Sequence, residues 1–180
     1  LPNIINVNED FCRLAGYYLS EGYTNSRDAI SFCFRDEEKK YIKDLQILMK
    51  RTFGLAPSQI CKKEDYHGIE IIYSSKILVN IFGHLFYTSP DTKRAHTKAM
   101  PNWMLELPLK KQVEIFRGWW RGDTGYTSSR TLMNQMKIIL LRLGVIPSIY
   151  EQTKENFNKK YFHEYKLESR TIKARHDLFS

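Results

Sequence analysis

The sequence is poor in the features that define several common protein classes. Only three of its 180 residues are cysteine, at Cys12, Cys33 and Cys61. The count is odd and no pair has the C-x-x-C spacing, which argues against a disulfide framework or a zinc knuckle. We therefore expect the three cysteines to be small buried hydrophobic residues in a reducing compartment.

Long apolar runs and metalloprotease motifs are also missing. No stretch approaches the ~20 consecutive apolar residues that span a membrane. The five histidines are scattered without the H-E-x-x-H spacing, so we expect surface or hydrogen-bonded residues rather than metal ligands. The start, Leu1-Pro2-Asn3, lacks the basic and apolar regions of a signal peptide. It also lacks an initiator Met, which favours a piece processed or excised from a longer chain.

Negative charge is the scarcer sign in this sequence. There are 28 Lys and Arg residues against 20 Asp and Glu, which gives a net charge of +8. A surplus of this size favours polyanionic partners through counterion release. Charge alone does not separate a nucleic-acid-binding protein from a basic scaffold protein with no enzymatic role.

What the sequence does contain is an internal repeat. The first copy runs from Phe11 to Gly22 and the second from Val113 to Asp123. In both copies a glycine precedes an acid by five residues, as Gly16 precedes Glu21 and Gly118 precedes Asp123, at an offset of 102 residues. The chain is therefore interpreted as a duplicated unit.

The similarity continues downstream of the two acids. Leu45–Arg51 leads into Gly54-Leu55-Ala56-Pro57-Ser58, and Met136–Arg142 leads into Gly144-Val145-Ile146-Pro147-Ser148. We divide the chain into subdomains at residues 1–99 and 100–180. The second copy is about a dozen residues shorter between its acid and its next helix, so its hairpin there is deleted or missing from the sequence.

Each copy is predicted to begin with a helix that ends at its acid. Asn8 is expected to cap a helix from Glu9, and Gly22 suits the position just past its end. In the second copy we place Pro108 at the first helical position, with Val113, Phe116 and Trp120 on the apolar face. A glycine in a helix costs roughly 1 kcal/mol, so Gly16 and Gly118 indicate that the two helices pack closely and bring both acids together.

The rest of the unit alternates strands and helices. Ile30, Phe32 and Phe34 alternate with smaller or charged residues, which predicts a strand over Arg27–Arg35 with one core face. The other expected elements are helices at Lys39–Arg51 and Ser75–Phe86, hairpins of Gln59–Lys63 with Gly68–Ser74 and of Ser148–Lys154 with Lys160–Leu167, and a last helix at Ser169–Phe179. The predicted fold is α+β, built from duplicated α-β-β-α-β-β-α units.

The repeated segments carry a family resemblance. Leu14-Ala15-Gly16-Tyr17-Tyr18-Leu19-Ser20-Glu21-Gly22 resembles the signature motif of LAGLIDADG homing endonucleases. Phe116–Asp123 resembles the second copy found in single-chain, intein- or intron-encoded members. The resemblance covers nearly the whole chain, and it extends to His96–Trp103 and to the Leu-Gly-Val-Ile-Pro run.

This resemblance implies a pseudo-twofold monomer with the motif helices at the interface. Each half would supply a saddle-shaped antiparallel sheet that lies in the DNA major groove. Glu21 and Asp123 would be the catalytic acids and would bind divalent metal, usually Mg²⁺, with Mn²⁺ as a substitute and Ca²⁺ as an inactive one. The activity implied is site-specific cleavage of both strands of double-stranded DNA, intracellular and promoting homing of an intron or intein.

Basic residues complete the expected site. Lys98 lies where the family often places a basic residue near the scissile phosphate, and a plain surface or phosphate-contacting lysine is the alternative. Its counterpart in the second copy would fall beyond Ser180. Candidates for DNA binding from the exposed strand faces are Arg27, Arg35, Lys62, Lys63, Lys154, Lys160, Lys166 and Arg170.

Two further functions stay open on the sequence alone. One is a non-cleaving nucleic-acid binder of the same fold, such as an RNA maturase or a regulator, which could lose the acids that this chain keeps. The other is a self-splicing intein, which needs a nucleophilic Cys or Ser at its first position and a His-Asn pair at its end. The chain begins with Leu1 and ends with Phe179-Ser180, which do not supply that chemistry, so we expect at most the endonuclease part of an intein.

Overall fold

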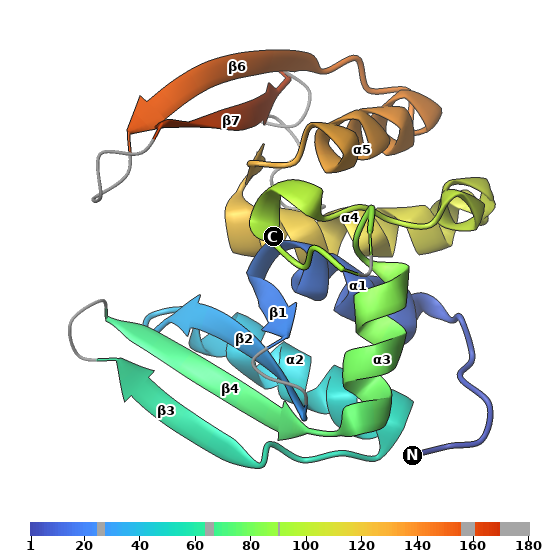
Figure 1. Cartoon of the computed structure of the whole chain (residues 1–180). Coiled ribbons are helices and arrows are strands. Elements are labelled where there is room, and N and C mark those ends of the chain that lie inside the picture. Colours follow the sequence, from blue (N-terminus) through green and yellow to red (C-terminus); the bar gives the residue numbers. More distant parts are fainter. Residues whose placement is uncertain (25–27, 64–66, 90, 156–160, 170–180) are drawn as a thin grey trace.

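The fold is two antiparallel sheets built around a central pair of helices (Figure 1). The computed structural model describes residues 1–24, 28–63, 67–89, 91–155 and 161–169, without the side chains of residues 161 and 162. The elements are α1 (Glu9–Glu21), β1 (Gly22–Thr24), β2 (Ala29–Arg35), α2 (Lys39–Phe53), β3 (Gln59–Lys63), β4 (Gly68–Ser74), α3 (Lys76–Leu85), the 3₁₀ turns η2 (Ala95–Thr97) and η3 (Asn102–Glu106), α4 (Leu109–Asp123), β5 (Tyr126–Thr127), α5 (Arg130–Arg142), β6 (Ser148–Glu155) and β7 (Tyr161–Glu168).

Helix α1 forms as its sequence predicts. The side chain of Asn8 accepts a hydrogen bond from the backbone N–H of Phe11 at 2.9 Å, which satisfies one of the free donors at the helix start. Its apolar residues are buried, including Tyr17 and Tyr18. A helix buried on so much of its surface lies in the middle of the molecule, with partners on several sides.

The two interface glycines let α1 and α4 meet backbone to backbone. A Cβ added at Gly16 would lie 2.7 Å from the backbone nitrogen of Trp119 and 2.9 Å from the Cα of Gly118. A Cβ at Gly118 would lie 2.8 Å from the backbone nitrogen of Tyr17. Neither helix has room for any side chain at its glycine, so the contact itself explains why a poor helix former stands there.

A half-buried acid on α2, Asp44, interacts with both central helices. Asp44 accepts hydrogen bonds from Tyr17 Oη at 2.9 Å and from Arg13 Nη1 at 3.2 Å, both on α1. It also pairs with Arg121 Nη1 of α4 at 2.7 Å. Charge-assisted bonds of this kind fix orientation, so α2 helps to hold the ends of α1 and α4 that carry the repeated acids.

The first sheet has the strand order β1-β2-β4-β3. Phe32 of β2 stands opposite Ile71 of β4, and both face the core, whereas Cys33 stands opposite Glu70 on the outer face. The hairpin of β3 and β4 has the predicted bounds. Lys62 and Lys63 are neighbours in β3, so their side chains point to opposite faces of the sheet.

The second sheet has the order β5-β7-β6 and lacks one strand of the first. Only Thr124–Ser129 separates α4 from α5, so the two-residue strand β5 pairs directly with β7. The described part of the second half therefore reads α-β-α-β-β rather than the full predicted unit. The second copy is shorter than the first by about a dozen residues at this point, and these residues correspond to the absent strand.

Three details of the helix ends differ from expectation. Pro108 is the N-cap of α4 rather than its first helical residue. Gly22 follows α1 in an extended conformation, with φ −83°, and begins β1 instead of a left-handed cap. Thr124 takes the left-handed conformation after α4, at φ 46°. On α4 the fully buried apolar side chains are those of Ile115, Phe116 and Trp119. Val113 and Trp120 are half-buried, so the buried face of α4 is displaced by one residue from the predicted one.

The segment between the two halves is packed rather than loose. The side-chain amide of Gln135 on α5 bonds both the backbone N–H and the carbonyl of Met100, each at 2.8 Å. The subdomain boundary at residues 99–100 stays a prediction. The expected helix over Ser169–Phe179 lies outside the described residues except for Ser169. None of the described helices is both long and apolar enough to cross a membrane.

Candidate functional site: an acid pair between two sheets

The two repeated acids lie together at the ends of the central helices. Glu21 is the last residue of α1 and Asp123 the last residue of α4. A Cβ added at Gly122 would stand 2.8 Å from Glu21 Cγ and 2.7 Å from Ser20 Cβ. The glycine before Asp123 thus leaves the space that the Glu21 side chain uses, and both acids line one cavity of about 490 Å³.

The surroundings of the acid pair oppose ionisation. Burial raises the pKa of Glu21 above its ordinary value, and the nearby negative charge of Asp123 raises it further. Burial also raises the pKa of Asp123, which Lys98 partly offsets. Each acid also stands at a helix C-terminus, where the helix dipole disfavours an anion. Two unfavourably placed carboxylates are typical of a functional site rather than of structural acids.

Lys98 reaches the acid pair from the segment after α3. Its ammonium donates to the backbone carbonyls of Tyr18 at 3.0 Å and Ser20 at 2.9 Å, and the residue is only 7% exposed. Burial lowers its pKa to about 8, although Asp123 and Glu21 act in the opposite direction. Lys98 therefore caps the C-terminal carbonyls of α1 and also lines a second cavity, of about 210 Å³, together with Asp123.

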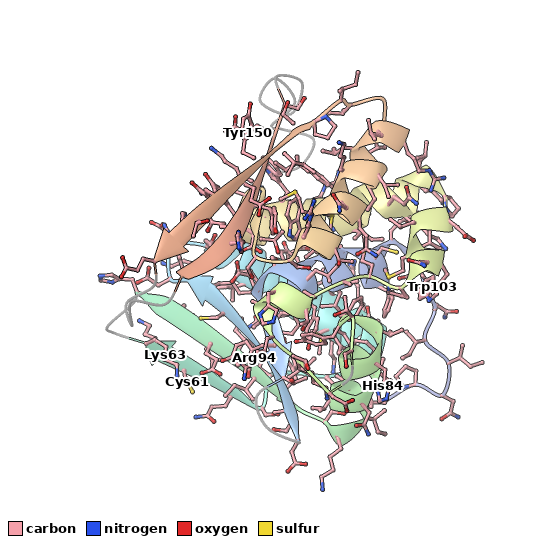
Figure 2. All side chains as sticks on the ribbon, turned by 45° about the horizontal axis from the view of Figure 1, so that its top comes forward. Cys61, Lys63, His84, Arg94, Trp103 and Tyr150 are labelled. Carbon is pink, nitrogen blue, oxygen red and sulfur yellow. The ribbon has the colours of Figure 1, made fainter. Side chains whose placement is uncertain are left out.

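The expected DNA-binding residues divide into distinct groups. Arg27, Lys160 and Arg170 lie outside the described residues. Arg35 and Lys154 line the larger cavity with the acids, so the structure brings them to the candidate site itself. Lys63 and Lys166 lie on the outer faces of the two sheets, whereas Lys62 points to the opposite face of β3. Figure 2 shows Lys63 and Cys61 on β3, and Tyr150 on β6 of the other sheet.

Most of the described candidate cations already have an acidic partner. Lys63 pairs with Glu70 at 3.0 Å, and Lys166 pairs with Glu168 at 2.5 Å. Glu70 is only 4% exposed and also accepts from Tyr23 Oη at 2.5 Å, so it is a fixed anchor on the outer face of the first sheet. The outer faces are therefore more neutral than the net charge of the chain suggests.

Several residues at the site were not singled out in the sequence. Glu38, the N-cap of α2, and Glu164 of β7 line the larger cavity with Glu21 and Asp123. Tyr126 of β5 lines both cavities. The signal for Glu164 is its two-residue spacing from Lys166 in one strand, which puts both on the same face. Nothing local in the sequence marks Glu38 or Tyr126.

The cysteines differ in part from expectation. Cys12 is fully buried in the core as expected, but Cys33 and Cys61 are half-buried on the outer face of the first sheet. Both stand opposite Glu70 in the strand register. They are free thiols, and no C-x-x-C pair or disulfide is formed among the described residues.

Comparison with known proteins identifies the family. Residues 124–177 match the family model of a LAGLIDADG-like domain. The chain therefore contains a LAGLIDADG-like domain. Nearly all of this LAGLIDADG chain, 96%, also superposes on 96% of a structure of a mesophilic variant of the homing endonuclease I-DmoI, with a TM-score of 0.66 at 14% identity. A second I-DmoI structure, in complex with its target DNA and with 2 mM Mn present, gives a TM-score of 0.58 at 15% identity over 90% of this chain and 88% of that one.

The curated relatives of this LAGLIDADG chain are much longer than it is. It is 49% identical over 156 residues to an uncharacterised protein of Methanocaldococcus jannaschii, covering 87% of this chain and 20% of that one. It is 27% identical to a DNA polymerase of Thermococcus sp. (strain GE8), covering 78% of this chain and 8% of the polymerase. The chain spans about a fifth or less of the length of these relatives.

The two carboxylates suit a hard divalent cation that phosphate oxygens of a substrate would also help to bind. Among the described residues, no group of three or more His, Cys, Asp and Glu side chains is arranged as a complete metal site. Mg²⁺ is commonly held by only one or two carboxylates plus phosphate oxygens and water. Glu21 and Asp123 supply two such carboxylates, and a cation held by them would favour the ionised form of Glu21, which burial and the charge of Asp123 disfavour.

Proposed function

We propose that this chain is a site-specific double-strand DNA endonuclease that uses Mg²⁺ and acts as a monomer. The observation that carries the proposal is the placement of Glu21 and Asp123, one from each repeat, in a single cavity between two sheets. Both acids are needed if each repeat contributes to cutting one strand. I-DmoI, whose fold this chain shares, is a homing endonuclease that has been crystallised with its target DNA.

Each group at the site has a task in phosphodiester hydrolysis. Glu21 and Asp123 would hold the metal, which when bound neutralises developing negative charge and favours a hydroxide-like water. Lys98 would place its ammonium beside the phosphate, where it stabilises charge that grows in the transition state. Arg35, which lines the larger cavity, would bind the DNA backbone.

The two sheets would bind the duplex on either side of the cut. The outer face of the first sheet offers Tyr23 and Lys63, held by Glu70, and the second offers Tyr126 and Lys166. Lysine donates to guanine in the major groove, and tyrosine hydroxyls bind phosphates or bases. Arg27, Lys160 and Arg170 stay candidates for the same role.

The relatives favour a role in homing. Segments similar to this chain occur in proteins as different as DNA polymerases and an iron–sulfur cluster assembly SufBD family protein, where they take up 7–9% of the length. A short segment shared by otherwise dissimilar proteins is typical of an inserted mobile element. We propose that the nuclease cuts an uninterrupted copy of the host gene and so promotes insertion of its own intron or intein.

The experiment must separate cutting from binding because a non-cleaving binder of the same fold is the alternative. Duplexes bound by the protein are selected from a randomised library in Ca²⁺, and the enriched sequences are then incubated with Mg²⁺. Cleavage by the wild type and none by Asp123→Asn, which should still bind, supports the nuclease. Specific binding with no cleavage by the wild type in Mg²⁺ or Mn²⁺ would show the binder instead.

A further inference from the structure

Two cavities meet at the acid pair and share one wall. Asp123, Tyr126 and Glu164 line both of them. The larger, of about 490 Å³, also has Glu21, Arg35 and Lys154 in its wall. The smaller, of about 210 Å³, has Lys98 in its wall. Among the described residues, each cavity therefore contains one lysine, and the two lysines come from different parts of the chain.

Lys154, on the edge strand β6, is held by an ion pair and by a tyrosine ring. Its ammonium pairs with Glu164 at 2.5 Å, and Glu164 is fixed in turn by Gln152 Nε2 at 2.7 Å. The ammonium also lies over the ring of Tyr126, 5.6 Å from the ring centre. The Lys154 side chain is 45% exposed, so part of it faces the solvent that DNA would displace.

The Lys98 ammonium is held by the same kinds of contact in the smaller cavity. Two backbone oxygens accept from its ammonium, which lies 5.8 Å from the centre of the Tyr18 ring. In both cases oxygen acceptors and a tyrosine ring fix the ammonium in a cavity that Asp123 also lines. A lysine that is already ordered loses less side-chain entropy when a phosphate binds, which suits a group that must be placed accurately.

We propose that Lys154 is a catalytic residue that contacts the scissile phosphate of one strand in the larger cavity, and that Glu164 is its positioning residue. Lys98 does the same for the other strand in the smaller cavity. This inference rests on the proposed nuclease function. The ammonium in the larger cavity comes from β6, a position that the repeat does not predict.

The test measures the cutting of each strand separately. A selected target duplex carries a different fluorophore on each strand, and single-turnover rates are measured with saturating protein. Lys154→Met should slow one strand about 100-fold, the loss typical of removing one transition-state donor, and should leave the other within threefold, so that nicked DNA accumulates. Lys98→Met should slow the opposite strand. Lys154→Arg, which keeps the charge, should retain most of the rate.

Lys63 provides the matched control. It is paired with Glu70 on the outer face of the first sheet at 3.0 Å, but it lines neither cavity. Lys63→Met should raise the Kd measured in Ca²⁺ and should change both strands alike at saturation. Lys154→Met should change that Kd by less than fivefold. The contrast separates a group that acts in the reaction from one that only binds DNA.

The role of Glu164 is tested by a double-mutant cycle. Glu164→Gln should slow the same strand as Lys154→Met, and it should have no further effect when Lys154 is already Met. Equal slowing of both strands by Lys154→Met, or a change in Kd alone, would overturn the inference while leaving the nuclease proposal intact. A wild type that binds its selected DNA and never cuts it overturns both.

Discussion

Neutralising one acid of the pair should stabilise this protein while abolishing its proposed activity. In the folded chain Glu21 and Asp123 are crowded together, and burial raises the pKa of both. The unfolded chain solvates each carboxylate freely. At pH values above the ordinary carboxyl pKa, the two carboxyls ionise in the unfolded chain more readily than in the folded one. The free energy of unfolding therefore falls as the pH rises. Asp123→Asn removes one charge and lets Glu21 ionise alone.

The magnitude follows from the pKa shifts and their screening. One unit of pKa is worth about 1.4 kcal/mol. Solvent screens part of the repulsion because neither Glu21 nor Asp123 is fully buried, and Lys98 loses an attractive partner in the variant. A net gain of about 1–2 kcal/mol remains, and for a chain of this length it corresponds to a rise in Tm of about 2–8 °C.

The assay is thermal unfolding of both proteins between pH 3.5 and 7.5, without divalent metal. The gain should be small at pH 3.5, where both carboxyls are mostly protonated in the folded and in the unfolded state, and should grow toward pH 7.5. Glu106→Gln removes an exposed acid on η3 and should change Tm little at any pH. Adding Mg²⁺ should raise the Tm of the wild type more than that of Asp123→Asn, because a ligand stabilises the state that binds it.

Two results would refute this reasoning. A Tm of Asp123→Asn below that of the wild type at pH 7.5 would show that the carboxylate stabilises the fold. A gain of equal size at pH 3.5 and pH 7.5 would show that packing, rather than charge, is responsible. Either result would remove the electrostatic argument for a functional acid pair and leave only its geometry.

Three further predictions concern the helix interface, the buried lysine and the DNA-binding face. Gly16→Ala should destabilise the fold by at least about 3 kcal/mol, at the upper end for overpacking, because the added methyl meets the backbone of α4. The control is Gly68→Ala, whose added methyl would have its nearest neighbour at 3.7 Å and should lower the free energy of unfolding by less than about 1 kcal/mol. Equal losses for the two variants in denaturant titrations would contradict the close helix contact. The value of kcat/KM should fall above about pH 8, as Lys98 loses its proton in the enzyme without DNA. Lys98→Arg should move that fall to higher pH. If the alkaline part of the profile is the same in the variant, Lys98 is not the group that titrates. Lys63→Ala should lower the slope of log K against log salt by about 0.9 if its ammonium binds a phosphate, and a slope equal to that of the wild type in binding titrations would place Lys63 away from the DNA backbone.

The local structure of the first half follows directly from its sequence. The Asn8 cap, the apolar periodicity of α1 and the alternation of Ile30, Phe32 and Phe34 depend on neighbours within a few residues, so they can be read from the chain alone. The hairpin of β3 and β4 is set by the same local rules. The family resemblance rested on two such local motifs and their spacing, and the fold confirms it.

Other features depend on which surfaces meet. Gly22 fits a left-handed cap in isolation, but pairing of β1 with β2 holds it in an extended conformation. Trp120 carries the apolar spacing, yet α1 covers Trp119 more completely. The missing strand of the second sheet is visible as a length difference, whereas the direct pairing of β5 with β7 is not.

The sequence by itself determined the duplication, the two glycine-bearing helices and the identity of the acids, because each is written in a contiguous segment. Only the tertiary structure decided that Lys154, Glu164 and Glu38 gather around those acids. These side chains lie 17 to 41 residues from the nearer acid along the chain and come from β6, β7 and the start of α2. Their positions are set by strand register and by helix packing. Both depend on many contacts between distant segments, so they cannot be predicted from any single stretch of residues.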